Sequence, residues 1–168
     1  MIKLKLFWKI YKIWFIRLIL LASTSIILLI GYWYFEKQKT EAKIFSDYQL
    51  IEVSKNKTKL KLYLADTPKK STTGLSIVTS LPKNQGMLFT FPQKSYHSFW
   101  MKNMKISIDI IFLSDGKITD ILENITPESY PQTFTSSVPA NQVIEINAGE
   151  SKSLGLNVGD FIDLTFIK

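Results

Sequence analysis

The chain has 168 residues, the length of one domain, and its 46% hydrophobic content is enough to bury a core. It has no cysteine and one histidine, which excludes disulfides and disfavours zinc, so we expect no metal and no cofactor. Residues 1–45 carry eight basic and two acidic side chains, whereas residues 46–168 carry thirteen and twelve, so the net charge of +7 belongs mainly to the N-terminal part. A nearly neutral globular part disfavours nucleic-acid binding.

The first predicted element is a transmembrane signal-anchor helix over residues 13–35. Its uncharged stretch, Leu18 to Phe35, is about as long as a hydrocarbon core requires, and Trp14 and Trp33 mark two aromatic interface belts. Five basic residues precede this stretch and three follow it, which places the basic segment 1–12 in the cytoplasm. We therefore expect a single-pass protein of the cell membrane that contacts the lipid bilayer through this helix and exposes its C-terminal domain outside the cytoplasm.

The alternative is a cleaved signal peptide, with the small residues of LLASTS at 20–25 as the cutting site. The apolar run continues beyond that site to Ile30, whereas the apolar core of a signal peptide normally has about 7 to 15 residues. The anchor is therefore favoured. Residues 36–49 are polar and are predicted to be a tether, and residues 50–168 are predicted to form the globular domain, on the periplasmic side or at the outer surface.

From about residue 50 onward, short apolar runs rich in β-branched and aromatic residues alternate with turn signals, a pattern that predicts strands. The first strand, 59–66, alternates leucines with lysines and a tyrosine, as expected of a strand with one buried face. Ser-Asp-Gly at 114–116 predicts a tight hairpin, because Asp-Gly accepts the positive φ angles of such a turn. Six further strands are predicted at 86–91, 97–101, 108–113, 117–122, 142–147 and 161–167.

Two short helices are predicted, one from Pro68 to Gly74 or a few residues beyond, and one over 150–154. The stretch 126–141 contains three prolines and no periodicity, which indicates a long connection of the kind that forms lids and binding loops. Seven strands and two short helices predict a mainly β fold, namely an antiparallel β-sandwich or partly closed barrel.

Polar residues interrupt the apolar stretch 97–113. Asp109 lies between two isoleucines, and a buried carboxylate must be paired or hydrogen-bonded. Lys102 and Asn103 are near in sequence, so we expect Lys102 to supply charge to Asp109, or Asn103 or free backbone N–H groups to supply hydrogen bonds. One interpretation is a polar network that fixes the turn between two strands. The other is a concave site in which Trp100 is a platform and the polar groups orient a ligand.

Glu145 and His97 complete the set of candidate site residues. Glu145 also lies between two isoleucines, and it could face Asp109 or Lys102 across a sheet; a carboxylate pair could do acid and base work on a sugar, although a structural ion pair is the commoner arrangement. His97 and Ser98 are adjacent on a predicted strand and point to opposite faces, so they cannot act together as base and nucleophile. Motifs of nucleophilic hydrolases and phosphate loops are absent from the sequence, which leaves an enzymatic role uncertain and disfavoured.

Several motifs agree in order and spacing with one known family. They are ADTP at 65–68, GMLFTF at 86–91, FWMKN at 99–103, Asp109, Asp-Gly at 115–116, VIEINAG at 143–149 and VGD at 158–160. With them the chain resembles, over roughly residues 59–167, the bacterial and archaeal family called domain of unknown function 192. The resemblance implies one compact, mainly β domain of sandwich or jelly-roll-like layout, often exported or membrane-anchored, without an established activity.

The sequence departs from the family pattern at several positions. Met104 follows Asn103 where the family usually has threonine, and Ser-Ile at 107–108 replaces Pro-Leu. Near 73–79, arginines and a methionine that are usual in the family are replaced by hydroxyl side chains, at Thr73, Ser76 and Thr79. If those arginines form a ligand site in the family, the resemblance implies that this site is weakened here.

Two functional hypotheses follow. The first is a membrane-anchored extracytoplasmic binding or envelope-interaction module, with an envelope glycan or protein as its partner. The second is an extracytoplasmic hydrolase that acts on cell-wall glycan with Asp109 and Glu145 as a carboxylate pair, assisted by Lys102 or His97.

Overall fold

The structure is a computed structural model that describes residues 2–55 and 58–164, and it forms two compact units, Met1–Lys43 and Ile44–Lys168. Helix α1 runs from Ile2 to Ile44 and therefore includes most of the predicted tether. Its segment Trp14–Glu36 has a mean hydropathy of 2.1 and none of it is buried, so the helix is long and apolar enough to cross a membrane. The predicted long apolar N-terminal helix is confirmed, and its membrane topology stays a prediction.

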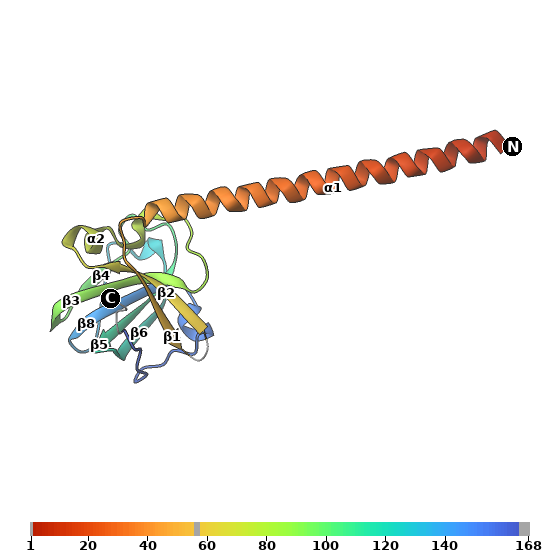
Figure 1. The fold of residues 1–168 in the computed structure, drawn as a ribbon. Helices are drawn as coiled ribbons and strands as arrows, with labels where there is room; N and C mark the ends of the chain where they lie inside the picture. The colour runs from red at the N-terminus through yellow and green to blue at the C-terminus, as the bar shows by residue number, and fades with distance from the viewer. Residues whose placement is uncertain (1, 56–57, 165–168) are drawn as a thin grey trace. The chain divides into compact units, whose positions relative to one another are not determined.

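The second unit is built on a six-stranded sheet with the order β1-β2-β3-β8-β5-β6, and β4 and β7 form a separate two-stranded sheet (Figure 1). The strands are β1 Leu50–Lys55, β2 Thr58–Ala65, β3 Gln85–Ser95, β4 Ser98–Trp100, β5 Ile108–Ser114, β6 Lys117–Ile125, β7 Thr133–Thr135 and β8 Ala140–Asn147. Short helices lie between them: α2 Pro68–Thr73, the 3-10 helices η1 Gly74–Ile77 and η2 Pro127–Ser129, and α3 Glu150–Ser153. The mainly β fold with few short helices is confirmed.

The six-stranded sheet is mixed rather than wholly antiparallel as predicted. Strands β2 and β3 run parallel, and every other neighbouring pair is antiparallel. The chain leaves β2, passes through α2 and η1, and returns to start β3 from the same end of the sheet, which is how a crossover produces a parallel pair. The sheet is not closed into a barrel.

The predicted hairpin is present between β5 and β6. Asp115 and Gly116 have φ angles of 51° and 80°, as a two-residue hairpin turn requires. The side-chain oxygens of Asn141 and Gln142 accept hydrogen bonds from the N–H groups of Asp115 and Gly116, at 2.9 and 2.8 Å. The turn is thus held by its own conformational preference and by the neighbouring strand.

Three segments differ from the strand prediction. Strand β1 was not predicted, and β7 lies within the stretch that was predicted to be a long connection. Of the predicted strand 161–167, Phe161 forms an isolated bridge with Lys117, and residues 165–167 lie outside the described part of the chain. The two unpredicted strands are short, and β1 lies at the edge of the six-stranded sheet.

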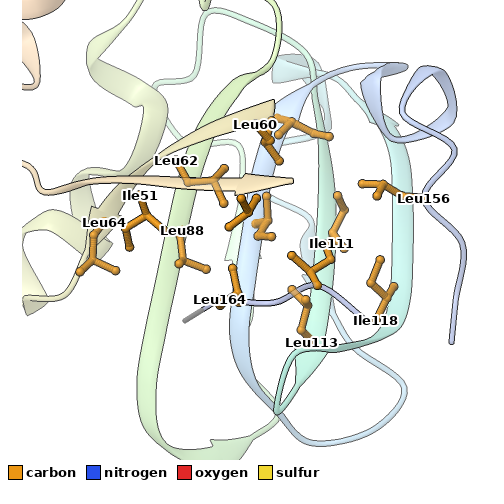
Figure 2. Packing of buried hydrophobic residues seen from close by; sticks show 14 residues of the cluster. Ile51, Leu60, Leu62, Leu64, Leu88, Ile111, Leu113, Ile118, Leu156 and Leu164 are labelled. Atoms are coloured by element: carbon orange, nitrogen blue, oxygen red, sulfur yellow. The ribbon is translucent and has the colours of Figure 1, made fainter. Parts of the chain in front are cut away.

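Both faces of the six-stranded sheet are buried by separate groups of apolar side chains. The first core, seen in Figure 2, lies on one face and includes Leu62, Leu88 and Ile111. The second core lies on the other face and includes Met87 and Phe89. Because successive side chains of a strand point to opposite faces, each central strand contributes alternately to the two cores.

Gly86 is a position where the backbones of β3 and β8 approach too closely for a side chain. A Cβ atom there would lie 2.4 Å from the backbone oxygen of Glu145 and 2.7 Å from a methyl carbon of Ile146. We expect Gly86→Ala to reduce the free energy of unfolding by about 1 to 3 kcal/mol, because the added methyl group overpacks the sheet. Urea unfolding measures the change, with the partly exposed Thr90→Ala on the same strand as control. Equal stability of Gly86→Ala and the wild-type chain would contradict the close approach.

Candidate functional site

A pocket of about 230 Å³ lies over the face of the sheet that carries the second core. Its walls come from the α2–η1 segment, from β3, from β4 with the turn that follows it, and from β8. The lining consists of hydroxyl side chains (Ser71, Thr72, Thr73, Ser76 and Ser98), aromatic rings (Phe89, Phe91, Phe99, Trp100 and His97), Gly74, Leu75, Met104, Lys102 and Glu145. Apolar walls with a few convergent polar groups are typical of small-molecule sites, and this volume suits a ligand smaller than a drug.

Glu145 supplies the buried carboxyl group of this pocket. It lies in the middle of β8, paired with Met87 on β3 and Ile110 on β5, and its side chain is 5% exposed. Burial raises the pKa of Glu145 to about 8, and a hydrogen bond from the backbone N–H of Leu75 opposes that rise in part. Its Oε2 atom is buried and has no hydrogen-bond partner in the described part of the chain. At pH 7 the carboxyl group is therefore mostly protonated and has one unused oxygen.

His97 is the second residue of the pocket with a buried polar atom that lacks a partner among the described residues; a third such atom, Oε2 of Glu150, lies outside the pocket lining. Its ring stacks on Phe91, with ring centroids 3.6 Å apart and planes 15° apart, and its Nε2 atom has no hydrogen-bond partner among the described residues. Phe99 packs edge-on between Phe89 and Phe112, at centroid distances of 5.1 and 5.8 Å. Unsatisfied buried polar atoms are uncommon in folded proteins, so two of them at one pocket are typical of a site that a ligand completes.

The hydroxyl wall follows from how α2 begins and ends. Thr67 caps the helix by accepting from the backbone N–H of Lys70 at 3.3 Å, and Pro68 occupies the first turn, as its missing N–H group allows. Gly74 ends the helix with a φ angle of 52°, and a Cβ atom there would lie 3.7 Å from Oε2 of Glu145. The segment 71–76 is thereby placed across the carboxyl group of Glu145.

Asp109 lies on the opposite face of the sheet from Glu145. In the register of β5 and β8, Asp109 pairs with Ile146, which belongs to the first core, whereas Glu145 pairs with Ile110 of the second core. Paired residues of an antiparallel sheet point to the same face. The two carboxylates therefore do not share a cleft, and the geometry for a glycosidase pair of Asp109 and Glu145 is absent.

Asp109 is fully buried, and the loop and helix after β8 bond its carboxylate. Its Oδ1 atom accepts from the N–H groups of Asn124 and Gly149, at 2.8 and 3.0 Å. Its Oδ2 atom accepts from the N–H and hydroxyl groups of Ser151, at 3.0 and 2.6 Å. Gly149 is the N-cap of α3 and has no side chain, so Asp109 supplies the capping carboxylate from β5.

The predicted candidate residues thus separate into three places. His97, Trp100, Lys102 and Glu145 line the same pocket. Asp109 holds α3 and the end of β6, and among the described residues neither Lys102 nor Asn103 bonds it. Asn103 is exposed, with a φ angle of 61°, in the turn after β4. The expected contact between Lys102 or Asn103 and Asp109 was wrong, because β5 turns the Asp109 side chain toward the first core. Backbone N–H groups, the other expected source of hydrogen bonds, bond the carboxylate instead.

The sequence prediction missed the hydroxyl wall and the phenylalanines of the pocket. Two of the positions that depart from the family pattern, Thr73 and Ser76, are part of that wall. The signal was the run of hydroxyl residues around Gly74 in STTGLS, directly after a predicted helix start. It was not sufficient alone, because hydroxyl residues at a helix end also serve as caps.

Comparison with known proteins places the second unit in a family. Residues 50–164 match the profile of DUF192, described as an uncharacterised group. Two crystal structures are similar, and each alignment covers 69% of this chain. One is a proposed transcription regulator from Sinorhizobium meliloti, with 31% identity, a TM-score of 0.63 and 94% of its own chain covered. The other is a protein of unknown function from Novosphingobium aromaticivorans, with 28% identity, a TM-score of 0.62 and 84% of its own chain covered. No curated protein matches. The chain belongs to the DUF192 family.

Proposed function

We propose that the chain is a membrane-anchored, extracytoplasmic domain that binds a small ligand in the pocket around Glu145. The observation that carries this proposal is the buried Oε2 atom of Glu145 at the wall of that pocket, which has no hydrogen-bond partner among residues 2–55 and 58–164. An unsatisfied buried polar atom costs about 1 to 3 kcal/mol, which a ligand that bonds it would recover. The carboxylate of Asp109, by contrast, has both oxygens bonded within the protein.

The binding proposal predicts that a bulky residue at the mouth of the pocket abolishes ligand binding. Thr72 is exposed and lines the pocket, whereas Lys69 lies on the same helix outside the lining. The experiment is a thermal-shift screen of small metabolites and cell-wall sugars on the full chain in nonionic detergent. We expect compounds that raise the melting temperature of the wild type and of Lys69→Trp but not of Thr72→Trp. Compounds that stabilise all three proteins equally bind elsewhere and would contradict the proposed site.

The extracytoplasmic location is supported by the apolar segment Trp14–Glu36 and by the five basic residues that precede its uncharged stretch from Leu18 to Phe35. The chain has no cysteine, so single cysteines report its topology. We expect a membrane-impermeant maleimide to label Val158→Cys, at an exposed position, in spheroplasts, and to label Lys3→Cys only after lysis. Labelling of Lys3→Cys in intact spheroplasts would contradict the proposed topology and indicate the opposite orientation.

Two other roles, transcription regulation and glycan hydrolysis, receive less support. The Sinorhizobium relative is named for transcription regulation, but residues 46–168 of this chain carry a balance of only +1, which gives no electrostatic footprint for a phosphate backbone. A glycan hydrolase would need a second carboxylate near Glu145. Asp109 faces the other core, so we propose binding rather than catalysis.

A further inference from the structure

Three of the five pocket hydroxyls, those of Ser71, Thr72 and Ser76, donate their hydrogen atoms to the protein backbone. Ser71 donates to the carbonyl of Ala65, and Thr72 to that of Pro68. Ser76 donates to the carbonyl of Thr73 at 2.6 Å. A hydroxyl that donates to the backbone can only accept from a ligand. These three side chains therefore present oxygen lone pairs rather than donors to the pocket, and the hydroxyl of Ser98 is bonded to that of Thr135.

Glu145 offers the same kind of surface once its carboxyl group has lost its proton. Since Oε2 has no partner in the part of the chain that the structure describes, the backbone N–H of Leu75 bonds the other oxygen, and Oε2 is left for a ligand. The rings of Phe89, Phe99 and Trp100 line the same pocket, and the faces of aromatic rings attract cations. An ammonium group has three donors and no acceptor, and it brings the positive charge that a buried carboxylate otherwise lacks.

We propose that the pocket binds the protonated amine of a small ligand, with the ammonium group on Glu145 Oε2 and the hydroxyl wall, and the apolar body against the aromatic rings. The proposal rests on the binding function above and names its ligand class. When the amine binds, Glu145 loses its proton to solvent and the ammonium group keeps its own. Binding therefore releases one proton wherever Glu145 is protonated in the empty pocket.

The released proton can be assigned to Glu145 because few other ionisable groups line the pocket. The lining residues of α2, η1 and β3 have no ionisable side chain, and the neighbours of Glu145 on β3 and β5 are Met87 and Ile110. The remaining ionisable groups of the lining are His97 and Lys102, both from the segment around β4. Lys102 is exposed, so its repulsion of a bound cation is screened by solvent.

The test compares three probes of one size, benzylamine, benzyl alcohol and benzoate, by calorimetry on the full chain in nonionic detergent. We expect benzylamine to bind best, with an affinity roughly tenfold higher at pH 7.5 than at pH 6.5. Titrations in two buffers of different ionisation enthalpy should report close to one proton released per ligand. Glu145→Gln should lose both the proton release and most of the affinity. His97→Asn should keep the proton release, and Lys102→Met should bind benzylamine more tightly.

Preferred binding of benzoate, or equal binding of benzyl alcohol without proton release, would overturn the amine proposal and leave the binding function intact. Weaker benzylamine binding by Lys102→Met would also overturn it, because that result indicates an anion site. If Glu145→Gln is less stable than the wild type, the amine proposal is judged on the His97→Asn and Lys102→Met results alone. If benzylamine does not bind while the metabolite screen finds other ligands of the pocket, the amine class is wrong; if neither binds, the binding function itself is wrong.

Discussion

Asp109→Ala should reduce the free energy of unfolding by about 3 to 5 kcal/mol, a large part of the roughly 5 to 15 kcal/mol that holds a typical domain together. The carboxylate of Asp109 accepts four hydrogen bonds in a fully buried place. Its removal leaves the backbone N–H groups of Asn124, Gly149 and Ser151 without their acceptor, and each buried donor left unpaired costs about 1 to 3 kcal/mol. Urea unfolding of the full chain, followed by circular dichroism, measures the loss.

Two further variants separate the causes of that loss. Asp109→Asn keeps the size of the side chain but replaces one acceptor oxygen by a donor, so we expect most of the destabilisation to persist. Asp66→Ala removes an exposed carboxylate that pairs with Lys70 at 3.0 Å, and such surface pairs contribute about 0 to 1 kcal/mol. If Asp109→Ala costs no more than Asp66→Ala, the four bonds do not hold α3 and the loop before it.

Local chemistry made much of the fold predictable. The alternating leucines of β2 and the Asp-Gly turn at 115–116 express preferences of a few neighbouring residues, and the structure confirms both. The parallel pairing of β2 with β3 depends instead on how the α2–η1 crossover packs, which no local pattern reports. Strand β7 has three residues, and its partner β4 precedes it by more than thirty positions, so its pairing was equally hidden.

Asp109 and Glu145 show why the site was only partly predictable. Each is a carboxylate between two isoleucines in a central strand, and sequence alone gives them the same description. What distinguishes them is the face of the sheet on which each lies. Asp109 lies on the face that meets the N–H groups of the loop and helix after β8, and Glu145 lies on the face that meets α2, η1 and β4. A shift of register by one residue would exchange the two faces, so the roles are fixed by pairing over long distances in the chain.

Glu145 should make the domain less stable as the pH rises. Its pKa is about 8 in the folded state and 4.5 as its ordinary value, so between these values the folded state binds more protons than the unfolded state. Stability that depends on the protonated form is fully present below pH 4.5 and is lost as the pH rises toward 8, by about 1.4 kcal/mol per pH unit. The wild-type chain should therefore lose about 2 to 3 kcal/mol between pH 5.5 and 7.5 from this group alone.

Glu145→Gln keeps the shape of the side chain and cannot ionise, so the difference between wild type and variant isolates this contribution. We expect the variant to gain stability relative to the wild type across that pH range and to show a constant difference above pH 8. Glu150 is the matched control, because burial also raises its pKa but its Oε1 atom accepts from the N–H of Asn84 outside the pocket. Glu150→Gln should leave the Glu145 slope in place. A saturating ligand of the pocket that pairs with the ionised carboxylate should flatten the dependence of unfolding free energy on pH in the wild type. If Glu145→Gln leaves that dependence unchanged, Glu145 is ionised in the folded protein at neutral pH.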